Sequence, residues 1–176
     1  MNFNITTDKN QLKEIVALCI RNDFYKEDLW FINYKQLYPP MVKADKEKGV
    51  VIELKLMVSI SLLLNPKFCY KYFVLTNDTN KVIGFIVITH RADIFNGSCF
   101  LEYLLIDEAY QGKGLSNKLF NEFFDWCKEN NRTQIKIQFE PTDKLKYLYA
   151  KQGFKKVIIE EGDEIESKHE NWYKFM

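Results

Sequence analysis

The chain has 176 residues, of which 47% are hydrophobic and 15% aromatic, and it carries 25 Lys and Arg against 24 Asp and Glu. This length and composition predict one globular domain, or one domain with a helical insertion, rather than a disordered chain. The balanced charge argues against a nucleic-acid partner. Residues 50–64 are too short and too charged to span a bilayer, and the first ten residues lack the order of a signal peptide, so we expect a cytoplasmic protein.

The cysteines are far apart in the sequence and include no C-x-x-C pair. The only histidines that could join them as metal ligands are His90 and His169. We therefore expect no metal site. Each thiol lies in an apolar run, which favours four reduced, buried cysteines, although the same set could pair in a secreted protein. The four are Cys19, Cys69, Cys99 and Cys127.

The chain begins with a predicted strand and helix. Residues 3–5 alternate as a short strand does, and Thr7 or Asp8 could cap the helix that follows. The apolar residues of that helix recur at helical spacing. They are Leu12, Ile15, Val16 and Cys19.

The next segment is the least regular. Residues 24–38 are rich in aromatic side chains, and the Pro39-Pro40 pair predicts an extended break. Residues 50–64 then read as a helix that ends near Asn65-Pro66.

Residues 70–75 and 82–89 predict an antiparallel hairpin around the turn at residues 77–80, because both runs are rich in β-branched and aromatic residues. Asn96-Gly97 predicts a second turn that leads into a third strand over residues 99–106.

A long helix follows and ends near Asn130-Asn131. Alternation then predicts a strand over residues 135–139, a short helix over 145–151, and strands over 154–159 and 172–175. These elements predict an α/β (α+β) fold with a mixed, mostly antiparallel central sheet flanked by helices. The buried face of the long helix is marked by Leu115, Leu119, Phe123, Trp126 and Cys127.

The chemically informative segment, residues 102–116, runs from a strand through a glycine-containing turn into a helix. The first amides of a helix have no partner within it, so Gly112 and Gly114 would let the backbone approach a pyrophosphate. A plain strand-to-helix turn is the simpler alternative. A Walker loop requires Ser or Thr directly after Gly-Lys, whereas Lys113 precedes a glycine, and a dinucleotide fingerprint requires a glycine where Asn117 stands.

Two further runs of residues match known motifs. The run Gln111-Gly112-Lys113-Gly114-Leu115-Ser116 resembles the acetyl-CoA pyrophosphate loop of the GNAT acetyltransferase family, Gln/Arg-x-x-Gly-x-Gly/Ala, and departs from it at Ser116. The run Tyr149-Ala150-Lys151-Gln152-Gly153-Phe154 resembles the Tyr-x-x-x-Gly-Phe ending of the family's last long helix. The resemblance covers residues 70 to 160, and the first seventy residues only by element order.

The resemblance implies one GNAT domain over residues 1–176, with an N-terminal strand and acceptor-side helices in residues 1–66 and a CoA-binding core in residues 70–176. It further implies an N-acetyltransferase that moves an acetyl group from acetyl-CoA to a primary amine in a ternary complex. Its partners would be acetyl-CoA and a small amine or peptide, and a homodimer is compatible with the family. The acceptor is not named by any pattern in the sequence.

The resemblance also implies a set of cofactor contacts. The strand before the loop would offer backbone groups to the pantetheine arm, and Thr142 stands where many members have an Asn that touches this arm. The implied cofactor-binding residues are Leu104, Leu105, Ile106, Gln111, Gly112, Lys113, Gly114, Leu115, Ser116, Thr142 and Tyr149.

Two catalytic roles follow from the same resemblance. Tyr149 would be the general acid toward the CoA sulfur, because a phenol pKa lies near that of a thiol, and the alternative is a core aromatic. Glu102 would deprotonate the amine directly or through a water, and the alternative is a solvated strand residue. His90 is an alternative base, and the acidic run at residues 160–164 would either attract a cationic amine or form an exposed turn.

Two other functions remain open from the sequence. A GNAT-like module could bind CoA or an acyl-CoA without turning it over, since Ser116 and Thr142 depart from the family pattern. An unrelated α/β interaction domain, in which the glycines only turn the chain, would bind no CoA.

Overall fold

The computed structural model describes residues 1, 3–5, 11, 14–15, 17–19, 22, 70–90, 97–157 and 169–176. Several predictions fall outside these residues. They concern the cap at Thr7 or Asp8, the aromatic segment 24–38 with its proline pair, the helix over 50–64, Cys69, Asn96 and the acidic run 160–164.

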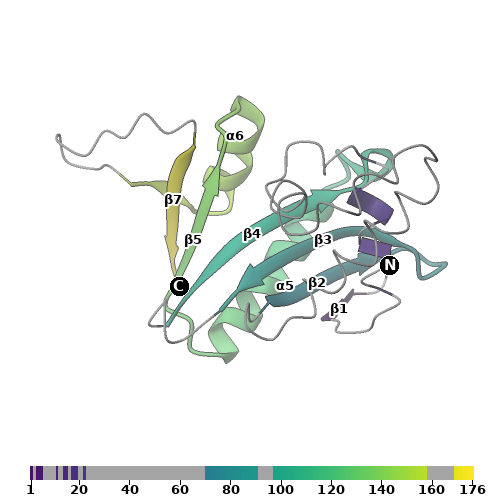
Figure 1. The fold of residues 1–176 in the computed structure, drawn as a ribbon, viewed down its shortest axis with the longest axis horizontal. Helices are drawn as coiled ribbons and strands as arrows, with labels where there is room; N and C mark the ends of the chain where they lie inside the picture. Colours follow the sequence, from purple (N-terminus) through teal and green to yellow (C-terminus); the bar gives the residue numbers. More distant parts are fainter. Residues whose placement is uncertain are drawn as a thin grey trace, which may run out of the picture.

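The described strands form one seven-stranded sheet in the order β1-β2-β3-β4-β5-β7-β6 (Figure 1). The pair β4–β5 is parallel and the other pairs are antiparallel, which confirms the predicted mixed, mostly antiparallel sheet. The strands are β1 (Phe3–Ile5), β2 (Tyr70–Thr76), β3 (Val82–Thr89), β4 (Ser98–Ile106), β5 (Gln134–Phe139), β6 (Lys155–Lys156) and β7 (Glu170–Phe175).

Helices cover both faces of this sheet. The helix α5 (Leu115–Glu129) packs on one face, and all five residues predicted for its apolar stripe are buried. The helix α6 (Asp143–Lys151) lies on the same side and contributes Tyr149 to that core. The described residues between Gln11 and Cys19 are helical and cover the opposite face.

Two apolar cores result from this layering. The larger lies between the sheet and α5 and includes Phe73, Ile86, Leu119, Phe120 and Phe123, each with 0% of its surface exposed. The smaller joins Ile15 and Leu18 to residues of β2 and β3, among them Val74, Phe85 and Val87. Burying one such side chain contributes about 1.5–3 kcal/mol, so these contacts hold the strands in register.

Some boundaries differ from those predicted. The helix α6 begins at Asp143 rather than at 145, because the Thr142 hydroxyl accepts a hydrogen bond from the Leu145 amide at 3.2 Å and so caps the helix two residues earlier. The strand predicted over 154–159 is represented by β6 alone among its described residues.

Three cysteines are described, and all three are thiols rather than disulfides. Cys99 and Cys127 are fully buried with their Sγ atoms 3.6 Å apart, and Cys19 is half-buried. Within the described ranges, no group of three or more His, Cys, Asp or Glu side chains could hold a metal ion, and no helix has the length and hydropathy of a membrane span.

Candidate functional site

The site begins where β4 and β5 separate. Their parallel pairing runs from Ser98 opposite Gln134 to Leu101 opposite Ile137, whereas β3 stays paired with β4 as far as Ile106. Figure 1 shows the two strands diverging beyond this point. From residue 102 onward, the edge of β4 toward β5 therefore has no ladder partner among the described strands. Its backbone groups need hydrogen-bond partners of another kind.

A β-bulge lies at the same point. Val87 pairs with Tyr103 and Ile88 pairs with Leu101, so Glu102 is an extra residue in β4. The bulge reverses the alternation of side chains along the strand: Leu101 and Leu104 both face the core beneath α5. Bulges are frequent next to active sites because they redirect side chains. The half-buried Glu102 accepts a hydrogen bond from Thr89 Oγ1 at 2.9 Å.

The turn from β4 into α5 contains two glycines in the left-handed region. Gly112 has φ 74° and Gly114, the N-cap of α5, has φ 71° with no side-chain cap. No backbone N–H of residues 112–116 has an acceptor among the described residues. These amides stand at the positive end of the helix dipole, which carries roughly half an elementary charge. The turn is therefore suited to bind a phosphate group.

Hydrogen bonds hold this turn against its neighbours. Gln111 Nε2 donates to the carbonyl of Ile106 at 3.0 Å, and Lys144 Nζ donates to Gln111 Oε1 at 3.0 Å. Gln152 Nε2 donates to Asn117 Oδ1 at 2.8 Å. The turn, the end of β4 and α6 are thus tied together, so the free amides are pre-positioned.

A cavity of about 580 Å³ lies between the end of β4, the turn and α6. Eight predicted cofactor residues line it: Leu104, Leu105, Ile106, Gln111, Gly112, Gly114, Leu115 and Ser116. Lys113 does not line it, because its Nζ donates to the Ala109 carbonyl at 3.1 Å and lies 4.9 Å from the centre of the Tyr110 ring.

Seven lining residues were not predicted from the sequence: Tyr110, Asn117, Lys144, Leu145, Tyr147, Leu148 and Lys151. Five of them, at positions 144, 145, 147, 148 and 151, recur at a spacing of three or four in α6, which is the spacing of one helix face. This spacing is visible in the sequence and could have identified the face of α6 that lines the cavity. The face toward the turn carries two ammonium groups, on Lys144 and Lys151.

Comparison with known proteins agrees with this geometry. Residues 69–156 match the family model of the acetyltransferase (GNAT) domain. The chain belongs to the GNAT acetyltransferase family. A comparison with curated proteins gives no match.

Solved acetyltransferase structures share this fold. A spermidine N-acetyltransferase from Vibrio cholerae is 17% identical with a TM-score of 0.66, over 99% of this chain and 95% of that one. An N-acetyltransferase from Thermoplasma acidophilum, in complex with coenzyme A, is 14% identical with a TM-score of 0.64 over 100% of both chains. A GNAT acetyltransferase from Staphylococcus aureus is 18% identical with a TM-score of 0.58 over 99% of both.

Tyr149 lies in the core of this GNAT chain. Its side chain is 6% exposed, and its ring centre lies 4.7 Å from that of Phe139, 5.8 Å from that of Phe154 and 6.3 Å from that of Phe120. Burial raises the pKa of Tyr149 to about 12, so the phenol is protonated at neutral pH. Tyr149 does not line the 580 Å³ cavity, whereas Tyr147 lines it and is 71% exposed.

The remaining predicted residues are spread over three places. Thr142 is outside the cavity lining and caps α6. Glu102 is also outside the lining, at the bulge where the strands separate. His90 lies on the α5 side of β3, with its ring centre 5.7 Å from that of Trp126 in the last turn of α5, so it is not brought to the cavity.

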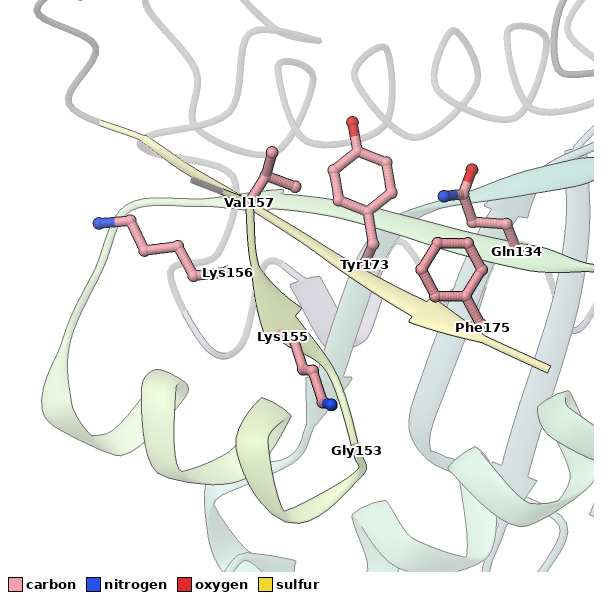
Figure 2. Close-up of a pocket in the computed structure, with 7 residues that line it drawn as sticks. All are labelled: Gln134, Gly153, Lys155, Lys156, Val157, Tyr173 and Phe175. Atoms are coloured by element: carbon pink, nitrogen blue, oxygen red, sulfur yellow. The ribbon is translucent and has the colours of Figure 1, made fainter. Parts of the chain in front are cut away.

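A second cavity, of about 500 Å³, is lined by residues of β5, β7 and β6, toward the β6 edge of the sheet (Figure 2). Figure 2 shows Tyr173, Val157 and Gln134 pointing away from the helices beneath the sheet. Lys155, Lys156, Gly153 and Phe175 complete its lining. It contains none of the predicted site residues and no glycine turn at a helix start, so it is not the candidate CoA site.

Proposed function

We propose that this GNAT protein transfers an acetyl group from acetyl-CoA to a primary amine of an unidentified acceptor, directly within a ternary complex. One observation carries the proposal: the amides of residues 112–116 lack acceptors among the described residues, at the start of α5 and beside the part of β4 that has no ladder partner toward β5 among the described strands. We also propose that residues 1–176 act as one domain, with residues 1–66 on the acceptor side.

In this proposal the CoA pyrophosphate accepts hydrogen bonds from the amides of residues 112–116. Charge-assisted hydrogen bonds of this kind contribute about 1.5–3 kcal/mol each. Lys144 and Lys151 line the same cavity and add positive charge opposite the phosphates. The pantetheine arm would lie along the free edge of β4 from Leu104 to Ile106, because its amides can pair with that backbone as a strand would.

The reaction requires three proton transfers. One proton of the incoming ammonium goes to Glu102, directly or through a water. The neutral amine nitrogen then forms a bond to the thioester carbonyl carbon, and the bond from that carbon to sulfur breaks. The departing thiolate receives a proton from the Tyr149 hydroxyl, and the second proton of the nitrogen, lost as the amide forms, returns the tyrosinate to the neutral phenol through solvent.

Support for the two roles differs. Glu102 has the better support, since the bulge and the 2.9 Å hydrogen bond from Thr89 hold its carboxylate at the point where β4 leaves β5. Tyr149 packs on Phe139, the last residue of β5, and so borders the separation. With a pKa of about 12 it remains protonated, which an acid requires, but it donates less readily than an unperturbed phenol.

The alternative is a GNAT module that binds CoA without turning it over. The burial of Tyr149 favours it, because the hydroxyl of a catalytic acid must reach the sulfur. Both functions share the pyrophosphate site, so CoA binding alone does not separate them.

The test has two parts. Calorimetric titration with CoA and acetyl-CoA measures binding, and an amine screen with acetyl-CoA, followed by release of free thiol, measures transfer. The screen includes polyamines, because the Vibrio cholerae relative is a spermidine N-acetyltransferase. Binding with acceptor-dependent thiol release supports the enzyme. Binding without release from any amine indicates the module, and absence of binding overturns both.

A further inference from the structure

A cluster of basic side chains lies at the end of α5 that is remote from the candidate CoA site. Lys71 in β2, His90 after β3 and Arg132 after α5 all surround the Trp126 indole. Lys71 Nζ lies 5.6 Å and the Arg132 guanidinium carbon 5.8 Å from the ring centre. Trp126 comes ten residues after Ser116, about 15 Å along the helix axis.

No carboxylate among the described residues balances the charges of this cluster. Neither Lys71 nor Arg132 forms an ion pair or a side-chain hydrogen bond within the described part of the chain. Arg132 Nε is the one buried side-chain nitrogen or oxygen among the described residues that has no hydrogen-bond partner. An unsatisfied donor on a charged group is costly, typically by more than about 1–3 kcal/mol.

The C-terminal dipole of α5 is an alternative explanation for these charges. A helix end carries roughly half a negative elementary charge, and cations near it are stabilised by about 0.3–1 kcal/mol. Two permanent cations and an imidazole exceed this charge. The pKa of His90 is lowered, first by burial and then by Arg132 and Lys71, and no described carboxylate raises it. The dipole therefore does not neutralise the cluster.

We propose that Lys71, His90 and Arg132, gathered around Trp126, form a binding site for a small oxyanion, either a tetrahedral phosphate-like group or a carboxylate. A guanidinium presents paired donors that match both anions, and an ammonium adds charge without geometric demand. The imidazole becomes a further donor when it takes up a proton. The site is separate from the acyl-CoA site, so it does not depend on the proposed transfer reaction.

The two histidines of the chain allow a direct test. The imidazole proton resonances of His90 and His169 are followed by NMR against pH, in sodium chloride and in sodium sulfate of equal ionic strength. Sulfate is the probe because it does not titrate in this range. A bound anion within about 4–6 Å should raise the His90 pKa by about one unit, and the His169 pKa should move far less. By linkage, sulfate should then bind about tenfold more tightly to the protonated His90 form.

Variants and a second anion sharpen the result. Arg132→Gln should abolish the sulfate-dependent shift, whereas Lys128→Gln, a control at the same end of α5 whose ammonium pairs with Asp125, should retain it. Replacing sulfate by acetate distinguishes the anion classes, and the anion effective at the lower concentration identifies the preferred one. Equal shifts of both histidines, or a full shift in folded Arg132→Gln, would overturn the site. The comparison of two histidines in the parent protein requires no variant to fold.

Discussion

Replacement of Gly114 by valine tests the pyrophosphate site most directly. Gly114 has φ 71°, and a Cβ built there has Asn117 Nδ2 at 3.9 Å as its nearest neighbour, so the cost comes from the backbone and not from a clash. A non-glycine residue in this region costs about 1–2 kcal/mol, which a domain of ordinary stability tolerates. The valine backbone would relieve this strain by moving to a negative φ. That movement would rotate the amides around residue 114 away from the phosphate.

The expected loss of CoA affinity follows from the hydrogen bonds removed. Loss of one charge-assisted bond costs about 1.5–3 kcal/mol, which is roughly a 10- to 150-fold rise in Kd measured by calorimetry. Gly97→Val is the matched control, because Gly97 also has a left-handed φ of 83° and lies at the start of β4, away from the cavity. A folded Gly114→Val protein that binds CoA as tightly as the parent would refute the assignment, and an equal loss in Gly97→Val would indicate a general effect of destabilisation.

Three further predictions concern the chemistry. Tyr149→Phe should keep the ring packing and CoA affinity but lower turnover roughly 100- to 10,000-fold, with the exposed Tyr147→Phe as control, and unchanged turnover would remove the acid role. Because the Tyr149 pKa is raised from about 10 to about 12, its contribution to stability is complete below pH 10 and lost as pH rises through 12, about 3 kcal/mol in all. The free energies of unfolding of the parent and of Tyr149→Phe, measured against pH, should therefore converge or cross between pH 10 and 12. Parallel pH profiles would contradict the burial of the Tyr149 hydroxyl. Glu102→Gln should lower kcat/KM about 100-fold or more while Thr89→Val, which leaves the carboxylate, lowers it less, and equal effects would assign Glu102 a structural role.

The sheet and its two covering layers were predictable because their signals are local. The β-branched and aromatic residues of 82–89 predict a strand, and the helical spacing from Leu115 to Cys127 reports which side of the helix is buried; the described structure confirms both. The N-cap at Thr142 was also readable in principle, since Thr followed by Asp is a common helix start.

The bulge at Glu102 could not be read from the sequence. The run from Phe100 to Ile106 is apolar apart from Glu102 and Tyr103, so no polar alternation marks where the strand changes face. Its position depends on the pairing of β4 with β3, which is a tertiary contact. The separation of β4 from β5 has the same origin. The sequence of one strand does not determine at which residue its pairing with the neighbouring strand ends.

The two tyrosines of α6 show why a motif does not determine an environment. Residues 147 and 149 are two positions apart and so lie about 200° apart around a helix, which means that only one of them can face the core. The aromatic side chains of Phe120 in α5, Phe139 in β5 and Phe154 between α6 and β6 surround Tyr149, so Tyr147 is left on the cavity side. Tyr149 thus occupies the motif position, whereas the exposed hydroxyl belongs to Tyr147. A catalytic role for Tyr149 therefore requires the thioester sulfur to reach the separation beside Phe139, and this requirement is what the comparison of Tyr149→Phe with Tyr147→Phe measures.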